Sequence, residues 1–261
     1  MKYFNPKTFD EYFAIPEKVC TLFAGGTDLM PRFEQGETLP ETIIDIKKLP
    51  NFIGIEKIDE NIVLGAGTTI EEIKNNELIK KYSNALWQAT TEFGSVQIRN
   101  RATIGGNICN ASPSGDTLPA LYAFGAKLLL RNKNGERTIP IDEFIVGPGK
   151  TSLEKGEILL AVILPQISSK SIFYKLGLRE AMAISVVNFA IVYDENELTI
   201  ATGAVAPTII KLSGLEKLSI DEILKIIDNA ISPIDDIRAT ATYRRKALQN
   251  MLRFELSKII K

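Results

Sequence analysis

The residues best suited to chemistry lie in one stretch, from Arg101 to Asp116, with the sequence RATIGGNICNASPSGD. Gly105 and Gly106 lack a Cβ, so the backbone there can take positive φ and approach a ligand closely. This half of the stretch predicts a turn that exposes backbone N–H groups, which bind phosphate. The second half is small and polar, and it ends in a carboxylate suited to a ribose hydroxyl. The stretch therefore predicts a nucleotide-binding site.

A second glycine pair, Gly25-Gly26, follows an apolar run of strand length at 19–24 and precedes Thr27 and Asp28. A strand, a glycine pair and a polar pair in succession indicate a second backbone site for phosphate. For Thr27 and Asp28, simple capping of a turn is the alternative. Neither glycine pair lies in a G-x-G-x-x-G or G-x-x-x-x-G-K-[ST] motif, so the Rossmann and P-loop signatures are absent.

Composition excludes several classes of site and partner. The 261 residues carry 31 basic and 32 acidic side chains, a net charge of −1, so neither nucleic acid nor an anionic membrane is an expected partner. No apolar segment reaches the ~18–20 residues of a membrane span, and the N-terminus lacks a signal-peptide pattern, so the cytoplasm is the expected location. There is no histidine, and the two cysteines are too few for this chain to hold an iron–sulfur cluster alone. Redox chemistry, if present, must belong to a bound organic cofactor.

Apolar periodicity and turn signals predict a mixture of short strands and helices. Strands are expected at 19–24, 42–46, 52–55, 61–64, 127–131, 137–140, 158–164, 185–193 and 197–201. Helices are expected after the capping motifs at 8–11, 69–72 and 219–222, and at 85–93, 118–125 and 240–261. Residues 141–149 are expected to form a loop. The polar segment 165–170, which has no periodicity, is the best candidate for a domain boundary.

The flanking sequences of both glycine pairs, at 22–29 and 102–116, resemble one family, the FAD-binding subunits of molybdenum hydroxylases. This family includes xanthine dehydrogenase and the medium subunit of aerobic carbon monoxide dehydrogenase. The resemblance covers essentially the whole chain, and further similar segments follow in the family's order. They lie at 62–69, 144–151, 156–159, 173–179, 203–208 and 243–245.

The resemblance implies an α+β fold with two parts. Residues 1–165 are expected to form a two-lobed α/β FAD-binding domain, with lobes of about 1–55 and 56–165 and FAD in the crevice between them. Residues 170–261 are expected to form a C-terminal domain, an antiparallel sheet covered by helices, that closes over the isoalloxazine.

The resemblance also implies the cofactor-binding residues. Main-chain N–H groups of the two glycine-containing segments are expected to hold the FAD pyrophosphate, with Asp116 near the sugar or ribityl portion and an aromatic ring, a leucine and a lysine at the flavin. These positions are Leu22, Phe23, Ala24, Gly25, Gly26, Thr27, Asp28, Leu29, Phe93, Thr103, Ile104, Gly105, Gly106, Asn107, Asp116, Leu159 and Lys175. Neither a catalytic side chain nor a metal ligand is expected.

Each of these assignments has a purely structural alternative. Asp116 and Lys175 are the kinds of residue found solvated on loops, while Phe93 and Leu159 suit ordinary core packing. Cys109, inside the central stretch, is expected to be a small buried residue rather than a redox thiol.

The resemblance implies an oxidoreductase subunit that relays electrons. An iron–sulfur subunit passes electrons to its FAD, which delivers them to NAD⁺ or another acceptor, while a molybdopterin-binding subunit hydroxylates the substrate. Two alternatives are a stand-alone FAD-dependent oxidase or reductase and a non-catalytic scaffold subunit. The first needs a substrate pocket with its own acid or base, and the C-terminal part offers no obvious one.

Overall fold

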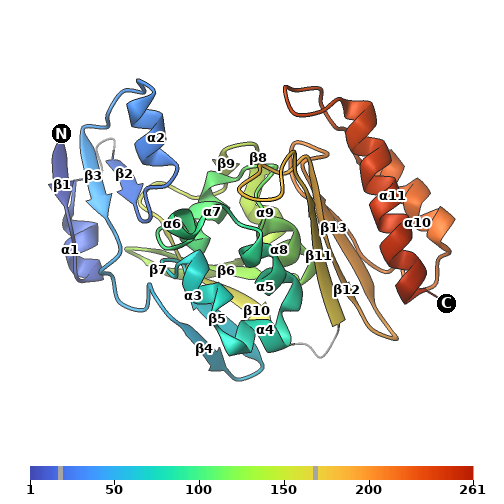
Figure 1. Ribbon diagram of the computed structural model, residues 1–261. Helices are drawn as coiled ribbons and strands as arrows, with labels where there is room; N and C mark the ends of the chain where they lie inside the picture. The colour runs from blue at the N-terminus through green and yellow to red at the C-terminus, as the bar shows by residue number, and fades with distance from the viewer. Residues whose placement is uncertain (17–19, 167–169, 261) are drawn as a thin grey trace.

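The computed structural model describes residues 1–16, 20–166 and 170–260. Its first lobe, blue in Figure 1, combines a parallel three-stranded sheet in the order β1-β3-β2 with two short helices. These elements are β1 (Lys2–Phe4), α1 (Phe9–Ala14), β2 (Cys20–Phe23), α2 (Leu29–Glu34) and β3 (Thr42–Asp45). Thr8 caps α1 by accepting a hydrogen bond from the N–H of Glu11, as the T-x-x-E pattern predicts. The segment that connects β2 to α2 begins at the carboxyl end of a parallel strand.

The second lobe is built on an antiparallel five-stranded sheet in the order β4-β5-β10-β6-β7. Its strands are β4 (Ile55–Ile58), β5 (Asn61–Gly65), β6 (Lys127–Asn132), β7 (Gly135–Pro140) and β10 (Ile158–Pro165). The strand predicted at 52–55 was wrong, because Phe52 to Gly54 bend toward the end of β5. The carbonyls of Phe52 and Gly54 accept hydrogen bonds from Gly67 and Gly65 there.

Helices between β5 and β6 complete the core of the second lobe. They are α3 (Ile70–Lys74), α4 (Glu77–Tyr82), α5 (Asn84–Thr91), α6 (Val96–Arg99), α7 (Ile104–Asn110) and α8 (Leu118–Ala123). Thr69 and Glu72 form the predicted capping box at the start of α3, with both reciprocal hydrogen bonds present. Ile70, Ile104 and Leu121 are fully buried with Ile62 of β5, so these helices and the sheet share one core.

Residues 141–149 are not the loop that the sequence predicts. They form α9 (Ile141–Phe144) and β8 (Ile145–Gly147), which pairs with β9 (Lys150–Thr151). The N–H of Ile141 donates to the carbonyl of Ala126, and Phe144 is fully buried, so packing onto the second lobe orders this segment.

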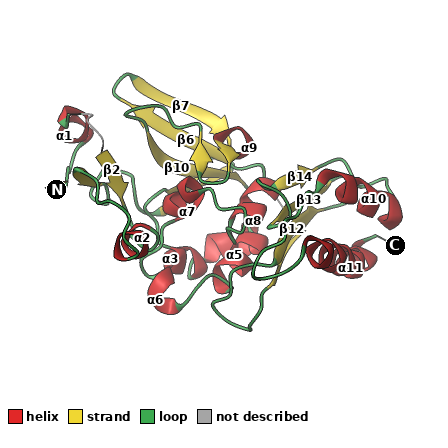
Figure 2. Cartoon of the chain, turned by 90° about the horizontal axis from the view of Figure 1, so that it is seen from above, coloured by secondary structure: helices red, strands yellow, loops and turns green. Residues whose placement is uncertain are grey.

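The C-terminal part is a four-stranded antiparallel sheet in the order β11-β12-β13-β14, with two helices. Its elements are β11 (Lys170–Leu176), β12 (Val187–Tyr193), β13 (Leu198–Gly203), β14 (Ile210–Leu212), α10 (Ile220–Ala230) and α11 (Ala241–Ile259). Figure 2 shows α10 and α11 on one side of this sheet and α5 and α8 on the other. Two cores result, because Phe173 and Ala190 face the second lobe whereas Phe189 faces α10 and α11. The predicted α+β class, with an antiparallel C-terminal sheet and helices, is confirmed.

Candidate functional site

A cleft of about 890 Å³ lies between the first and second lobes, within the range of roughly 300–1,000 Å³ typical of small-molecule sites. Helix α7 stands between the first lobe and α8 in both views (Figure 1, Figure 2). The cleft brings together most of the cofactor-binding positions predicted from the sequence. These are Leu22, Ala24, Gly25, Gly26, Thr27, Asp28, Leu29, Phe93, Thr103, Gly105, Gly106, Asn107 and Leu159.

Sequence reasoning missed other residues of the cleft. They are Thr21, Arg32, Glu37, Ile46, Phe52, Ala66, Ile98, Ala102, Cys109, Asn110, Gly149, Leu153 and Ile158. Asn110 follows Asn107 by three residues, so it would have been identified if a helix, rather than a turn, had been predicted at 104–110. Arg32 and Gly149 carry no such signal, because only the packing of the lobes brings them to the cleft.

The loop from Ala24 to Leu29 offers backbone donors to the cleft. Among the described residues, none of the N–H groups from Gly25 to Leu29 donates to another protein group. Gly26 has a φ of +75°, which glycine takes without strain. A Cβ on Gly25 would clash with the carbonyl oxygen of Arg101, so only glycine lets the loop lie this close to the chain before α7. Several unpaired N–H groups on one short loop make an anion-binding concavity.

The polar side chains of this loop are not used as a turn cap. Asp28 precedes α2 but makes no side-chain capping bond, and its carboxylate lies 3.4 Å from the Arg32 guanidinium instead. Arg32 also pairs with Glu37 at 2.8 Å, and all three side chains are about half exposed.

The central stretch corrects the prediction of an open turn. Thr103 caps α7, and the two glycines lie in its first helical turn without positive φ. The N–H groups of Ile104, Gly105 and Gly106 are already paired, with Thr68 O at 3.0 Å, Ala66 O at 2.8 Å and Thr103 Oγ1 at 3.1 Å. These three N–H groups are therefore not exposed for a ligand.

Close approach, rather than positive φ, explains the glycine at 105. A Cβ there would lie 2.7 Å from the Ala66 carbonyl oxygen, so a side chain would push α7 away from the turn that follows β5. Asn107 is a polar residue of α7 that lines the cleft, and its Oδ1 accepts a 2.6 Å hydrogen bond from Thr117 Oγ1. That bond turns the Asn107 amide nitrogen, a donor, away from Thr117.

Phe93 and Leu159 belong to both the core and the cleft wall. Leu159 is 4 % exposed and Phe93 is partly buried against the same core. The Arg99 guanidinium fixes the chain at Phe93, since it donates to the carbonyls of Phe93 (3.2 Å) and Gly94 (3.4 Å) and pairs with Glu71 at 2.6 Å. Core packing and a position at the cofactor site are therefore compatible for Phe93 and Leu159.

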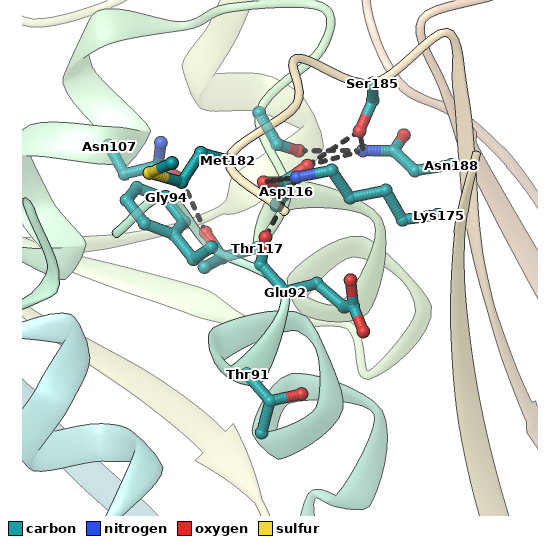
Figure 3. A network of polar contacts seen from close by, with 12 residues as sticks. Thr91, Glu92, Gly94, Asn107, Asp116, Thr117, Lys175, Met182, Ser185 and Asn188 are labelled. Atoms are coloured by element: carbon teal, nitrogen blue, oxygen red, sulfur yellow. Dashed lines mark hydrogen bonds and ion pairs between the residues drawn. The ribbon is translucent and has the colours of Figure 1, made fainter. Parts of the chain in front are cut away.

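Asp116 and Lys175 lie outside the cleft lining and pair with each other (Figure 3). Lys175 Nζ is 2.6 Å from an Asp116 carboxylate oxygen and donates to the carbonyl of Glu92 at 2.9 Å. Ser185 Oγ donates to the other carboxylate oxygen at 2.7 Å, and Asn188 lies beside it. Burial raises the pKa of Asp116, and the Lys175 ammonium opposes that shift. Both side chains are buried, so neither is the solvated loop residue that the alternative assumed.

The Asp116–Lys175 pair lies next to the cleft wall. Lys175 donates to the carbonyl of Glu92, and the next residue, Phe93, lines the cleft. Lys175 also borders a smaller surface pocket with Gly177, Arg179 and Met182. Two other predicted positions lie behind the cleft: Phe23, whose ring packs against Gly26, and Ile104, which is fully buried.

Cys109 lines the cleft as a thiol. Burial raises its pKa to about 12, so the reactive thiolate form is suppressed at neutral pH.

In the described ranges, no cluster of Cys, Asp or Glu side chains is arranged to hold a metal ion. Over the same ranges, none of the helices combines the length and apolar character that spanning a membrane requires.

Two family models together match most of the chain. Residues 1–167 match the FAD binding domain in molybdopterin dehydrogenase, and residues 172–258 match the CO dehydrogenase flavoprotein C-terminal domain.

Individual relatives agree with these models. The chain is 34 % identical to the nicotinate dehydrogenase FAD-subunit of Eubacterium barkeri (78 % of this chain, 72 % of the relative). It is 30 % identical to the xanthine dehydrogenase FAD-binding subunit of Escherichia coli (92 % and 88 %). The fold superimposes on a chain of carbon monoxide dehydrogenase from Hydrogenophaga pseudoflava with a TM-score of 0.87 and 27 % identity, covering 97 % of this chain and 94 % of that one. The chain therefore belongs to the FAD-binding medium subunits of the molybdopterin hydroxylases, the xanthine and carbon monoxide dehydrogenase family.

Proposed function

We propose that this subunit holds FAD across the cleft and relays electrons from iron–sulfur clusters on a partner subunit to NAD⁺ or another acceptor. A molybdopterin-binding subunit of the same complex carries the organic substrate. The names of the relatives support this reading, since they include FAD-binding subunits of xanthine and nicotinate dehydrogenases.

The loop Ala24–Leu29 is the observation that carries the proposal. The loop lines a cleft between two lobes, and its N–H groups from Gly25 to Leu29 have no acceptor among the described residues, so they are available as donors for the FAD pyrophosphate without a bound metal. Charge-assisted hydrogen bonds of this kind contribute about 1.5–3 kcal/mol each. Since the N–H groups of residues 104–106 are already paired, we assign the pyrophosphate to this loop, with the Asn107 amide as the donor from α7.

The apolar wall is suited to the flavin ring. Phe93, Leu159 and Ile98 line the cleft, while the Asp116–Lys175 pair lies beside the chain at Glu92. A lysine near the ring stabilises negative charge on a reduced flavin and so raises its potential. In this proposal Lys175 exerts that effect from behind Phe93, and Asp116 fixes the position of its ammonium.

FAD supplies chemistry that accepts electrons singly and releases them in pairs. The residues of this chain bind and orient it, exclude water with the apolar wall, and contribute no acid or base. The Cys109 thiol stays protonated at neutral pH because burial raises its pKa to about 12.

We infer two domains, residues 1–165 and 170–261, with lobes of about 1–55 and 56–165 in the first. The two family models, which meet between residues 167 and 172, support this division. The cytoplasmic location expected from the sequence stays a prediction.

The first test is the absorbance spectrum of the purified full chain, with its released cofactor identified by HPLC. We expect FAD at about one per chain. The Gly25→Ala variant should lower the affinity for FAD by at least about tenfold, because its Cβ clashes with Arg101 O and displaces the loop. Gly147→Ala is the matched control, since that site has space for a methyl group and lies outside the cleft.

A chain that is purified empty and fails to take up added FAD would overturn the proposal in favour of the scaffold alternative. A flavin-loaded chain that co-purifies with an iron–sulfur subunit would support the relay. A loaded chain that turns over a substrate alone would instead support the stand-alone oxidase or reductase.

A further inference from the structure

Lys47 lies directly behind the loop Ala24–Leu29. It follows β3 and does not line the cleft. Its ammonium donates to the carbonyl of Ala24 at 3.2 Å and lies 4.6 Å from the centre of the Phe23 ring. That ring packs under Gly26, where an added Cβ would lie 2.6 Å from it. Lys47 therefore contacts both the first carbonyl of the loop and the ring that supports the loop.

A buried carboxylate fixes the Lys47 ammonium in turn. Asp45 is 5 % exposed and lies 2.9 Å from Lys47 Nζ. Its carboxylate also accepts hydrogen bonds from Tyr3 Oη at 2.7 Å and from the N–H of Lys47 at 3.1 Å. Burial opposes ionisation of Asp45, but the bonds from Lys47 and Tyr3 outweigh it and hold the pKa of the carboxyl below its ordinary value. All three strands of the parallel sheet thus meet at one ion pair.

The direction of the Ala24 carbonyl determines the direction of the next N–H group. The described peptide bonds are trans, and in a planar trans peptide the C=O of one residue and the N–H of the next point in opposite directions. Since Ala24 O points to Lys47 behind the loop, the N–H of Gly25 points to the other side, where Gly25 lines the cleft.

We propose that Lys47, supported by Asp45 and Tyr3, is a positioning residue that aims the Gly25 N–H at the diphosphate of the bound nucleotide. This inference rests on the proposed function, because it takes the loop as the diphosphate site. Lys47 does not contact the ligand; it acts by preventing rotation of the Ala24–Gly25 peptide.

The test compares Lys47→Met with Lys48→Met in the full chain. Methionine keeps the aliphatic length and removes the ammonium, and Lys48 is the exposed neighbour. Dissociation constants are measured by calorimetry for FAD, for ADP, which has the diphosphate without the flavin, and for riboflavin, which has the flavin without phosphate. Lys47→Met should weaken FAD and ADP by a similar factor, about tenfold, and leave riboflavin within about twofold of wild type. Lys48→Met should change none of the three.

Two further variants separate positioning from general damage to the fold. Lys47→Arg, which restores a donor and a cation, should recover most of the lost ADP affinity. Lys47→Met combined with Asp45→Asn leaves no unpaired buried carboxylate, so it should fold and still bind FAD weakly.

The inference is overturned if Lys47→Met binds FAD and ADP as wild type does, or if riboflavin weakens by the same factor as FAD. The outcome for Gly25→Ala distinguishes a failure of the proposed diphosphate site from a failure of the proposed role of Lys47. If Gly25→Ala weakens FAD and Lys47→Met does not, only the role of Lys47 fails. If neither weakens FAD, the diphosphate does not lie on this loop.

Discussion

Arg99 shows how one buried side chain fixes the cleft wall. Its guanidinium pairs with Glu71 of α3 at 2.6 Å and donates to the carbonyls of Phe93 and Gly94, between α5 and α6. The Glu71 carboxyl has a lowered pKa because Arg99 hydrogen-bonds to it. Nothing in the spacing of the sequence around Arg99 indicated this role.

We expect Arg99→Gln to lower the free energy of unfolding by about 3 kcal/mol, since it removes one partner of a buried ion pair. The change should also weaken FAD binding, because Phe93 loses the donor that holds its carbonyl. Urea unfolding and FAD titration measure the two effects. Arg101→Gln, at an exposed position nearby, is the control. Equal stability of the two variants would show that the Arg99 network contributes little.

At the scale of elements, Asp236 fastens the loop before α11 to that helix. Its carboxylate accepts hydrogen bonds from the N–H groups of Arg238 (2.8 Å) and Ala239 (3.1 Å) and pairs with the buried Arg244 at 2.7 Å. Arg244 also donates to the carbonyls of Val186 and Ala204. One helix thereby holds the ends of β12 and β13.

This arrangement predicts an acid dependence of stability. Burial opposes ionisation, but the backbone donors and Arg244 outweigh it and lower the pKa of Asp236 from 3.8 to about 2. A lowered carboxyl pKa stabilises the fold fully above the ordinary value, and that stabilisation is lost as the pH falls from 3.8 toward 2. Urea midpoints measured across this interval should fall less steeply for Asp236→Asn than for wild type. Asp221→Asn, in an exposed pair with Arg253, should leave the slope unchanged, and an equal effect of both variants would refute the assignment.

At the scale of the whole molecule, the Asp116–Lys175 pair joins the second lobe to the C-terminal sheet. Asp116 lies in the loop before α8 and Lys175 lies on β11. Ser185, just before β12, and Asn188, on β12, complete the cluster. The cluster is buried next to Glu92, at the end of the cleft wall. It therefore links the orientation of the C-terminal sheet to the site.

We expect Asp116→Asn and Lys175→Met each to destabilise the apo chain by about 3–5 kcal/mol, because each leaves a buried charge without its partner. The double variant should cost less than the sum of the two, and a double-mutant cycle by urea unfolding measures the difference. The partly exposed pair Arg131–Glu136 provides the control cycle, with an expected coupling of at most about 1 kcal/mol. Additive effects at Asp116 and Lys175 would contradict a direct coupling.

Local sequence determined those features whose partners lie within a few residues. The capping boxes at Thr69 and Ser219 both form, and the hairpin between β6 and β7 turns at Lys133 and Asn134, because each depends on backbone geometry over two to four residues. The role of Gly25 and Gly26 could likewise be predicted from the sequence. Glycine is the residue type that allows close approach of the backbone to another group and positive φ. The family motifs predicted the fold class and about half of the residues that line the cleft.

Tertiary structure decided which polar groups remained available to a ligand. The N–H of Gly105 was predicted to be exposed, but the carbonyl of Ala66, in the turn after β5, accepts a hydrogen bond from it. Lys175, which is predicted to lie near the flavin, is held by a buried pair with Asp116, 59 residues earlier. Such pairings depend on how two lobes and a second sheet pack, and each buried polar group takes the nearest partner that packing provides. For the same reason Lys47, an unremarkable lysine in the sequence, acquires a position behind the loop Ala24–Leu29 only when three strands come together.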